Sequence, residues 1–328
     1  MRYYVTLFDS NYLTRGLVMY RSLLRNEKDF HLWVICFDDL MYKILTKMNL
    51  EKVTLVLLNE IEDERLLAFK STRPRIEYFF TCAPASILYV FNNFPEVETV
   101  TYLDADLMFF SPLEPIFKEN PNASIFLTEH RFFSWYQEPE QKYGRFNVQF
   151  MMFRRNDSGL TALNWWFEKC LELRYESDED NYGDQKCLDD WQERFDGVHV
   201  VQSLGAGLAP WNVSQYSLQQ QEDQIFIETE PLIFYHYSGF RIYGDKWVYL
   251  PLYCPLRISK NIKNLIYKPY LKEMKKVYQD IKKIDSNFDK GIENIFFPLK
   301  PSDHWHNRFM LFLKEIYKGR YYLYSVGK

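Results

Sequence analysis

The stretch VETVTYLDADLMFF at residues 97–110 decides the fold. Its first half, Val97–Leu103, is rich in β-branched and aromatic residues and predicts a strand. A long helical stretch at Glu77–Asn93, which Pro84 is expected to kink, precedes it. A helix that leads straight into an apolar strand is typical of a βαβ unit in a parallel sheet.

Toward the N-terminus, β-like runs alternate with amphipathic runs. The expected strands are Arg2–Phe8, His31–Phe37 and Thr54–Leu58, and the expected helices are Thr14–Leu24 and Asp39–Met48. This alternation predicts an α/β fold whose mixed, mostly parallel central sheet is flanked by helices. Toward the C-terminus the pattern is less regular, and the expected strands are Ala123–Thr128, Phe146–Arg154 and Pro231–Tyr237.

The composition changes near residue 256, where Lys, Tyr and Ile begin to recur at helical spacing. We therefore expect a main domain at residues 1–255 and a basic, mainly helical extension at residues 256–328. Residues 257–328 hold 16 Lys and Arg against 7 Asp and Glu, which leaves 24 against 37 for residues 1–256. Such an extension either docks at an anionic membrane surface or packs as a solvated helix against the body.

The composition excludes several classes of protein. Aromatic residues make up 18% of the 328 residues, which excludes disordered and collagen-like chains. The apolar runs are too short to span a bilayer, no secretory signal opens the chain, and five scattered cysteines are typical of a reduced cytoplasmic protein. The absence of G-x-S-x-G, Walker A and G-x-G-x-x-G motifs disfavours serine hydrolases, P-loop NTPases and dinucleotide enzymes. No nucleic-acid partner is expected.

Asp104 and Asp106 are the strongest candidates for a functional site. In an extended strand, side chains at i and i+2 leave the same face about 7 Å apart. Ligands of open α/β sheets bind beyond the carboxyl ends of strands, where this pair would lie. Two such carboxylates repel each other unless a cation lies between them, and oxygen ligands favour Mg²⁺, Mn²⁺ or Ca²⁺. The alternative is a surface turn in which both aspartates only cap backbone groups.

Four segments in order resemble the GT-A fold glycosyltransferases that use nucleotide-diphosphate sugars. The relevant group contains glycogenin, the bacterial lipopolysaccharide galactosyltransferases and uncharacterised bacterial relatives. The matching segments are TYLDADLMFF after the long helix, FNVQFMMFR (Phe146–Arg154), GDQKCLDDW (Gly183–Trp191) and FYHYSGF (Phe234–Phe240). With the FDSNY turn near the start, they span about residues 2–250, or three quarters of the chain.

The resemblance implies a metal-dependent site. Asp104, Asp106 and His236 would hold Mn²⁺ or Mg²⁺, and Asp104 would also lie close to the ribose or the sugar. A metal ion bound in this way neutralises the negative charge of the diphosphate of a sugar nucleotide as the glycosidic bond breaks. The alternative for His236 is a hydrogen-bonded core histidine on its expected strand.

The resemblance also implies which residues touch the donor. Asp9 and Asn11 would meet the base and ribose, Asn147 the donor sugar, and Asp184 and Gln185 the sugar that is transferred. Each has an ordinary alternative: Asp9, Asn11 and Asp184 could cap helices, and Asn147 could be a hydrogen bonder at a strand end. Asp184 and Gln185 are the expected catalytic residues, Asp189 or Asp190 is an alternative to Asp184, and retention of configuration is favoured over inversion.

The sequence departs from the family at three places. Gln149 stands where relatives often have glycine, so the space near the donor sugar could differ. Lys246, ten residues past His236, is the nearest match to a lysine that contacts phosphate in glycogenin-like relatives. Arg75, or else Lys70 or Arg73, would substitute for a basic residue that relatives carry within the long helix.

These observations predict a cytoplasmic hexosyltransferase. It would move a sugar from a nucleotide-diphosphate donor, UDP-linked by preference, to a polysaccharide or glycolipid acceptor. One rival is a nucleotidyltransferase, which usually has a glycine-rich basic loop after its first strand, and TLFDSNYLTRG contains no such loop. The other rival is a catalytically silent GT-A binding protein.

Overall fold

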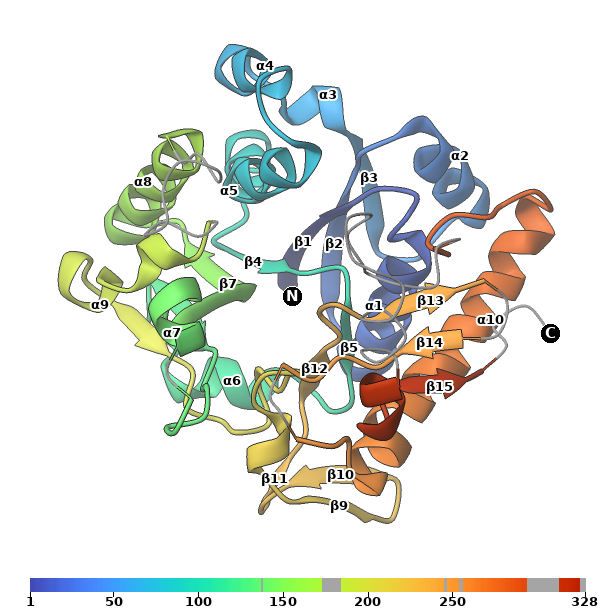
Figure 1. The fold of residues 1–328 in the computed structure, drawn as a ribbon. Coiled ribbons are helices and arrows are strands. Elements are labelled where there is room, and N and C mark those ends of the chain that lie inside the picture. Colours follow the sequence, from blue (N-terminus) through green and yellow to red (C-terminus); the bar gives the residue numbers. More distant parts are fainter. Residues whose placement is uncertain (137, 173–183, 245–246, 254–255, 294–312, 325–328) are drawn as a thin grey trace.

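The molecule is built on a seven-stranded sheet in the order β3-β2-β1-β4-β7-β6-β8 (Figure 1). The computed structural model describes residues 1–136, 138–172, 184–244, 247–253, 256–293 and 313–324. The strands of the sheet are β1 (Arg2–Phe8), β2 (Phe30–Cys36), β3 (Val53–Leu57), β4 (Thr99–Leu103), β6 (Ile125–Glu129), β7 (Phe146–Arg154) and β8 (Val198–Val200). The prediction of a mixed α/β fold is confirmed.

The first half of the sheet is parallel. Strand β1 lies between β2 and β4 and runs parallel to both, and β3 continues the sheet beyond β2. The chain passes from β1 outward to β2 and β3 and then crosses back to β4. The carboxyl ends of β1 and β4 therefore flank the switch point of the topology, where open α/β sheets bind their ligands.

The second half of the sheet is mixed. Strand β7 runs antiparallel to both β4 and β6, while β8 runs parallel to β6. The amino end of β7 therefore lies at the same edge of the sheet as the carboxyl ends of β1, β4 and β6. In the register, Leu103 is opposite Phe150 and Thr128 is opposite Asn147.

Helices cover both faces of the sheet because each strand alternates its apolar side chains. In β1, Tyr4 and Phe8 enter one core, and Val5 and Leu7 enter the other. The first core is covered by α1 (Leu13–Asn26), α2 (Asp39–Met48), α6 (Glu114–Glu119) and α10 (Lys268–Ile284). The second is covered by α3 (Leu58–Ile61), α4 (Glu64–Lys70), α5 (Arg75–Asn93), α8 (Asp157–Glu172) and α9 (Trp191–Arg194).

The helix boundaries follow from local chemistry. Asp38 caps α2 by accepting a hydrogen bond from the Met41 amide at 2.9 Å, and Asn49 ends that helix in the left-handed region at φ 48°. Helix α5 continues through Pro84 without a break from Arg75 to Asn93. The short α7 (Glu138–Tyr143) buries no side chain and lies near the edge of the sheet that holds the site.

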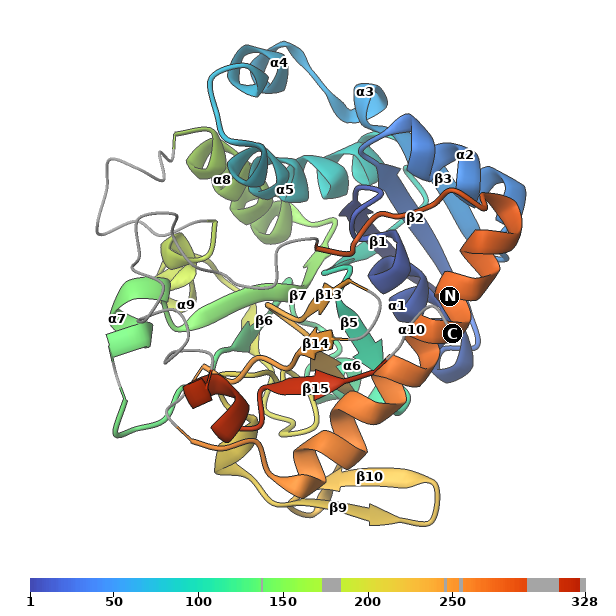
Figure 2. The same cartoon turned by 45° about the vertical axis from the view of Figure 1, so that its right-hand side comes forward.

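Smaller sheets occupy the rest of the chain. Strand β5 (Leu107–Phe109) pairs with β12 (Phe234–His236), and β9 (Leu218–Gln221), β10 (Gln224–Ile227) and β11 (Glu230–Pro231) form a second unit. A third unit contains β13 (Arg241–Tyr243), β14 (Trp247–Tyr249) and β15 (Tyr321–Leu323), beside α10 (Figure 2). The β14–β15 pairing joins residues on both sides of the boundary expected at 255/256, which stays a prediction.

The extension packs against the body through α10. The apolar side of this helix is buried and includes Tyr270, Leu271, Met274, Val277 and Ile281. The apolar side of α10 therefore packs inside the protein, and the lysine-rich side of the helix faces outward. In the described part of the chain, no helix combines the length and apolar composition that crossing a membrane requires.

Candidate active site

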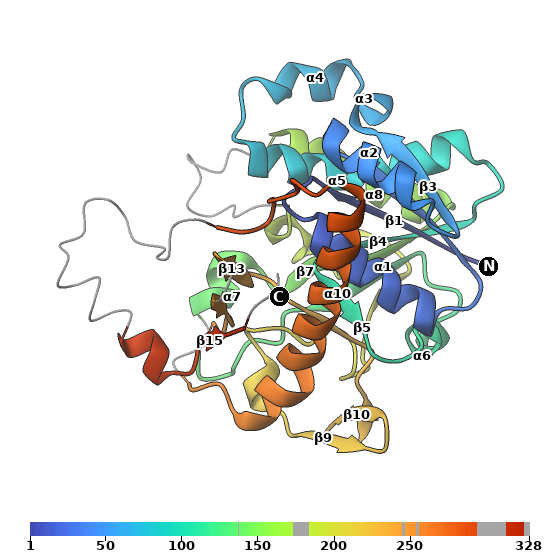
Figure 3. The ribbon, with the colours of Figure 1, turned by 90° about the vertical axis from the view of Figure 1, so that its right-hand side faces the viewer.

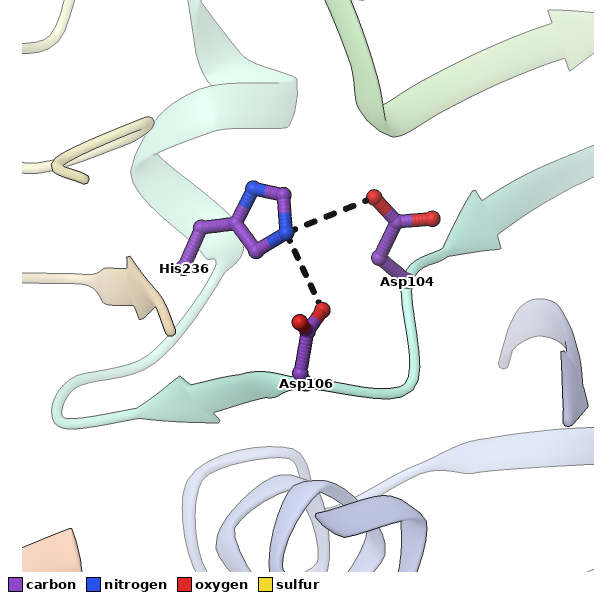
Figure 4. A group of neighbouring side chains, drawn as sticks. All are labelled: Asp104, Asp106 and His236. Carbon is purple, nitrogen blue, oxygen red and sulfur yellow. Dashed lines mark ion pairs between the residues drawn. The ribbon is translucent and has the colours of Figure 1, made fainter. Parts of the chain in front are cut away.

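Two carboxylates and an imidazole converge at the carboxyl end of β4. The His236 Nε2 atom lies 3.0 Å from Asp106 Oδ1 and 3.6 Å from Asp104 Oδ2 (Figure 4). One ligand atom from each residue can be chosen so that all three lie within 4.8 Å of one another. His236 arrives from β12, which is held in place by its antiparallel pairing with β5 directly after the two aspartates. Two oxygen donors and one imidazole nitrogen fit Mn²⁺ better than Ca²⁺.

The local geometry of the two aspartates differs from the expected extended strand. Strand β4 ends at Leu103, and residues 104–106 form a turn before β5 begins at Leu107. The Leu107 amide donates to the Asp104 carbonyl at 3.4 Å, and Ala105 is buried inside the turn. The turn, and not the strand pleat, therefore brings both carboxylates to the same imidazole.

The protonation of this trio is shifted by burial and by its own charges. Burial raises the pKa of Asp104 to about 6, although His236 opposes the shift. Burial also acts on Asp106, but His236 and Arg15 outweigh it and lower the pKa of Asp106. For His236, the two carboxylates outweigh burial and raise the pKa. The two carboxylates therefore favour the protonated form of the imidazole, and a metal ion would compete with its proton.

A cavity of about 1320 Å³ opens over the trio. It is larger than the range of about 300–1,000 Å³ that is usual for small-molecule sites. Every described residue that the sequence predicts as a donor or metal contact lines it: Asp9, Asn11, Arg75, Asp104, Asp106, Asn147, Asp184, Gln185 and His236. The predicted contact Lys246 lies outside the described residues.

Asp9 organises the turn after β1. Its Oδ1 atom accepts hydrogen bonds from the amides of Asn11 and Tyr12, and its Oδ2 atom accepts from Asn11 Nδ2 at 3.0 Å and from Arg75 at 2.9 Å. These bonds hold the turn ahead of α1, whose cap residue Tyr12 makes no side-chain cap hydrogen bond, so the expected helix-capping alternative for Asp9 is not observed. Arg75 is 62% exposed on its side chain and is held over the cavity by this ion pair.

The side chain of Asn147 forms hydrogen bonds with three neighbouring protein groups. Its Oδ1 atom accepts from the Gln149 amide, and its Nδ2 atom donates to His130 Nε2 and to Gln185 Oε1, each at 3.0 Å. Because Nδ2 carries only two hydrogens, both are used. Gln185, which lines the cavity, is thus held by Asn147 through its side-chain oxygen. Asn147 therefore positions Gln185, and its predicted contact with the donor sugar stays a prediction.

His130 completes this hydrogen-bond relay. It is 3% exposed, stacks on Phe132 with ring centroids 4.6 Å apart, and meets Trp211 edge-on. Burial lowers the pKa of His130 to about 3. The ring is therefore neutral at physiological pH, so its Nε2 atom can accept the hydrogen from Asn147.

A family model described as "Glycosyl transferase family 8" matches residues 4–188. The chain belongs to this family. Two relatives from Bacillus subtilis (strain 168) are the uncharacterized proteins YfnD and YfnF. YfnD is 36% identical over 296 residues, which cover 88% of this chain and 94% of YfnD. YfnF is 34% identical over 247 residues, which cover 73% of this chain and 82% of YfnF.

Solved structures support the GT-A fold of this glycosyltransferase. The galactosyltransferase LgtC, solved with donor and acceptor sugar analogues, aligns with a TM-score of 0.52 at 14% identity. The alignment covers 83% of this chain and 95% of LgtC. At this identity, the similarity establishes the fold alone. The expected resemblance to GT-A glycosyltransferases is confirmed, and the enzyme is a transferase.

Asp184 is the most isolated acid in the glycosyltransferase site. It is 4% exposed, and its Oδ2 atom has no hydrogen-bond partner among the described residues. Its backbone carbonyl is fixed by the indole of Trp166 at 2.9 Å. Burial, with the charge of Asp104 added, raises the pKa of Asp184 to about 8. The backbone of Asp184 is therefore held in place, and its carboxyl group is largely uncharged at neutral pH.

Sequence reasoning missed several residues that line the cavity, among them His130, Trp211, Tyr253, Lys318 and Arg320. His130 directly follows β6, and its position beyond a strand end was the available signal. Lys318 and Arg320 could not be predicted from their local sequence, because they reach the site through the pairing of β15, the last described strand, with β14. Gln149 is fully buried and is absent from the cavity wall, so its replacement of glycine does not narrow the cavity directly.

Proposed function

We propose that this protein transfers a sugar from a UDP-linked donor to a glycan or glycolipid acceptor in polysaccharide synthesis, with Mn²⁺ or Mg²⁺ held by Asp104, Asp106 and His236. The observation that carries the proposal is the convergence of these three side chains at one end of the cavity. The bound ion would supply positive charge to the diphosphate leaving group. LgtC was solved with donor and acceptor sugar analogues, which supports this class of substrates.

The residues around the trio would divide the work between binding and orientation. The turn at Asp9 and Asn11 would meet the nucleoside, and Arg75 would lie over it. The relay from His130 through Asn147 would hold the Gln185 amide toward the transferred sugar. Asp184, fixed beneath the same part of the cavity, would contact a sugar hydroxyl or the anomeric centre.

We propose retention of configuration. An inverting reaction needs a carboxylate base on the acceptor side of the sugar that is ionised at working pH. The described carboxyl groups that line the cavity are those of Asp9, Asp104, Asp106 and Asp184. Asp9 is bonded to Arg75 and the turn, two others belong to the trio, and the raised pKa of Asp184 makes it a poor base at pH 7.

Calorimetry with UDP tests the metal site. Binding to the full chain should require Mn²⁺ and should be lost in Asp106→Asn, with affinity lower by roughly 100-fold or more because a charged ligand of the ion is gone. The melting temperature should be nearly unchanged. Equal UDP binding in EDTA would contradict the metal assignment. Hydrolysis of UDP-, GDP- and dTDP-sugars then tests for catalysis, and silence with every donor would favour the binding-protein alternative.

We propose that the protein is cytoplasmic and that it contacts membranes through the charged side of α10. The exposed lysines there include Lys272, Lys276 and Lys283, while the apolar side is buried. Contact with anionic lipid would therefore be electrostatic, at about 1 kcal/mol per lysine near the surface. Sedimentation with phosphatidylserine vesicles at 50 and 500 mM salt tests it. Absence of vesicle binding at the lower salt would remove this part of the proposal.

A further inference from the structure

Both acidic and basic residues line the cavity. Asp104, Asp106 and Asp184 belong to its wall, and so do Lys318 and Arg320. Both basic residues belong to the C-terminal segment at residues 313–324, which lies beyond the part matched by the family model. In Figure 3 strand β15 of this segment lies near β13, with which it shares a sheet.

Backbone hydrogen bonds fix the position of both basic residues. The Leu250 amide donates to the Arg320 carbonyl at 2.7 Å, and the Ile258 amide donates to the Lys318 carbonyl at 3.1 Å. Strand β15, which follows directly, pairs with β14. The C-terminal segment is therefore attached to the chain around residues 247–258 on both sides of these cations.

The same stretch of chain reaches the metal-binding trio. The Tyr253 hydroxyl lies 2.0 Å from the place where a Cβ on Gly239 would stand, and Gly239 is three residues past His236. Tyr253 also stacks parallel to Trp211, which meets the ring of His236 edge-on. The basic residues therefore border the side of the cavity formed by the residues that follow His236.

The local charge around Lys318 is positive. Glu315 accepts a hydrogen bond from Arg320 at 2.6 Å and lies 3.7 Å from the Lys318 ammonium group. Lys318 and Arg320 thus share the Glu315 carboxylate. Gly319 lies between Lys318 and Arg320 in the sequence, and Lys263 Nζ lies 3.9 Å from the position that a Cβ atom on Gly319 would occupy. The side chains of Lys318 and Arg320 are only 16% and 11% exposed, so solvent screens them less than surface charges.

A nucleotide diphosphate needs more positive charge than the metal-binding trio offers. A divalent ion between Asp104 and Asp106 is neutralised by these two carboxylates, so little net charge remains to attract two negative phosphates. Arg75 is already paired with Asp9. Among the described residues that line the cavity, Lys318 and Arg320 are the other two with permanent positive charge.

We propose that Lys318, backed by Arg320, binds the diphosphate of the nucleotide sugar, so that the C-terminal segment forms part of the donor site. The inference rests on the proposed function and adds residues that the sequence did not indicate. Lys318 contributes a point charge with three donors, which suits phosphate oxygens. Arg320 is held by Glu315 and contributes mainly its charge.

Titration calorimetry on the full chain with Mn²⁺ tests the contact, with UDP and uridine as probes. Lys318→Gln should weaken UDP binding about 10-fold, the effect of one lost charge-assisted hydrogen bond, and should leave uridine binding unchanged. Lys318→Arg should keep UDP affinity within about threefold. Lys314→Gln is the matched control: it removes the same charge from the same short helical stretch, is exposed and does not line the cavity.

Each outcome decides the question. Unchanged UDP affinity in Lys318→Gln, or an equal loss in Lys314→Gln, would overturn the proposed contact. An equal loss of uridine binding would also overturn it, because uridine has no phosphate. If the unaltered chain fails to bind UDP with Mn²⁺, the proposed function itself fails, which is a separate result. Melting temperatures within about 2 °C of the unaltered chain would show that the variants are folded.

Discussion

Charged residues lie in different surroundings in two regions of the molecule. One region is the edge of the sheet that holds the site, and the other is the contact between α1 and α10, which we call the seam. In the seam, Arg21 pairs with Asp280 at 2.8 Å and Arg25 with Glu273 at 3.3 Å, outside a row of buried apolar side chains. At the sheet edge, Asp9, Asp106 and Asp184 are buried, Asp104 is 23% exposed, and Asp184 Oδ2 lacks a partner among the described residues. The seam is arranged for stability, whereas the edge keeps groups ready for a ligand.

This difference predicts which substitutions separate stability from activity. Buried polar groups without partners cost stability, and natural proteins retain them where function needs them. Substitutions at the edge should therefore change binding or turnover with little loss of stability. Substitutions in the seam should do the reverse.

The largest expected effect is at Asp184. Asp184→Asn should lower donor turnover by roughly 100- to 1,000-fold, as removal of one group aimed at the reacting centre does. It should also stabilise the fold by about 1–3 kcal/mol at pH 8, because the amide needs no charge in a buried place. Enzyme assays and thermal melts measure the two effects. A large loss of stability would show that the edge is structural and would break the comparison.

The same variant has a predicted pH dependence. The pKa of Asp184 is raised from 3.8 to about 8 in the folded protein, so the folded state binds a proton that the unfolded state has released between these values. Stability of the unaltered chain should therefore fall as pH rises from 4 to 8. Asp184→Asn removes this slope, and its advantage in melting temperature should be larger at pH 8 than at pH 5.

In the seam, Ile281→Ala should destabilise the protein by about 3 kcal/mol, because this fully buried side chain leaves a cavity. Turnover of the folded fraction should stay within about twofold of the unaltered chain. Chemical denaturation and assays below the melting temperature measure the two quantities. A loss of turnover comparable to that of Asp184→Asn would contradict the assignment of separate roles.

A smaller effect is expected at His130. His130→Leu should lower kcat about 10-fold, because Asn147 loses the acceptor that orients it and Gln185 becomes free to turn. His130→Gln should recover most of kcat, since its side-chain oxygen can accept the same hydrogen bond. KM for the donor should change less than kcat. Equal activity of both variants would show that the relay has no role in positioning.

The smallest effect is expected at the surface of the seam. Asp280→Asn should cost at most about 1 kcal/mol, because both partners of its ion pair with Arg21 are about one third exposed. The loss should diminish at 0.5 M salt. A cost above about 2 kcal/mol, measured by chemical denaturation, would mean that the seam depends on its charges as the edge does.

The sequence predicted the elements that depend on local pattern. Strands at Arg2–Phe8 and Phe146–Arg154 and the helix at Asp39–Met48 have the expected bounds. Hydrophobic periodicity and an aspartate cap act over a few residues, so a single sequence contains them. The extended geometry expected at Asp104 and Asp106 was wrong, because β4 ends at Leu103 and residues 104–106 form a turn before β5.

The candidate site was predictable where it follows a strand and not elsewhere. Asp9 and Asp104 follow the ends of parallel strands, and Asn147 lies at the amino end of the antiparallel β7, which reaches the same edge of the sheet. His130 escaped notice because its importance depends on an antiparallel neighbour that supplies Asn147. Lys318 and Arg320 escaped notice because a strand pairing between residues about 75 positions apart brings them to the cavity.

The order of residues alone determined the class of fold, the paired acids and the histidine that could bind a metal with them. Those features rest on short-range periodicity and on chemistry carried by a few neighbouring side chains. Only the tertiary structure decided which groups share a cavity, which acids lack partners and where the basic C-terminal segment lies. Burial and distance set the strength of a charge, and both are known only once distant strands have paired.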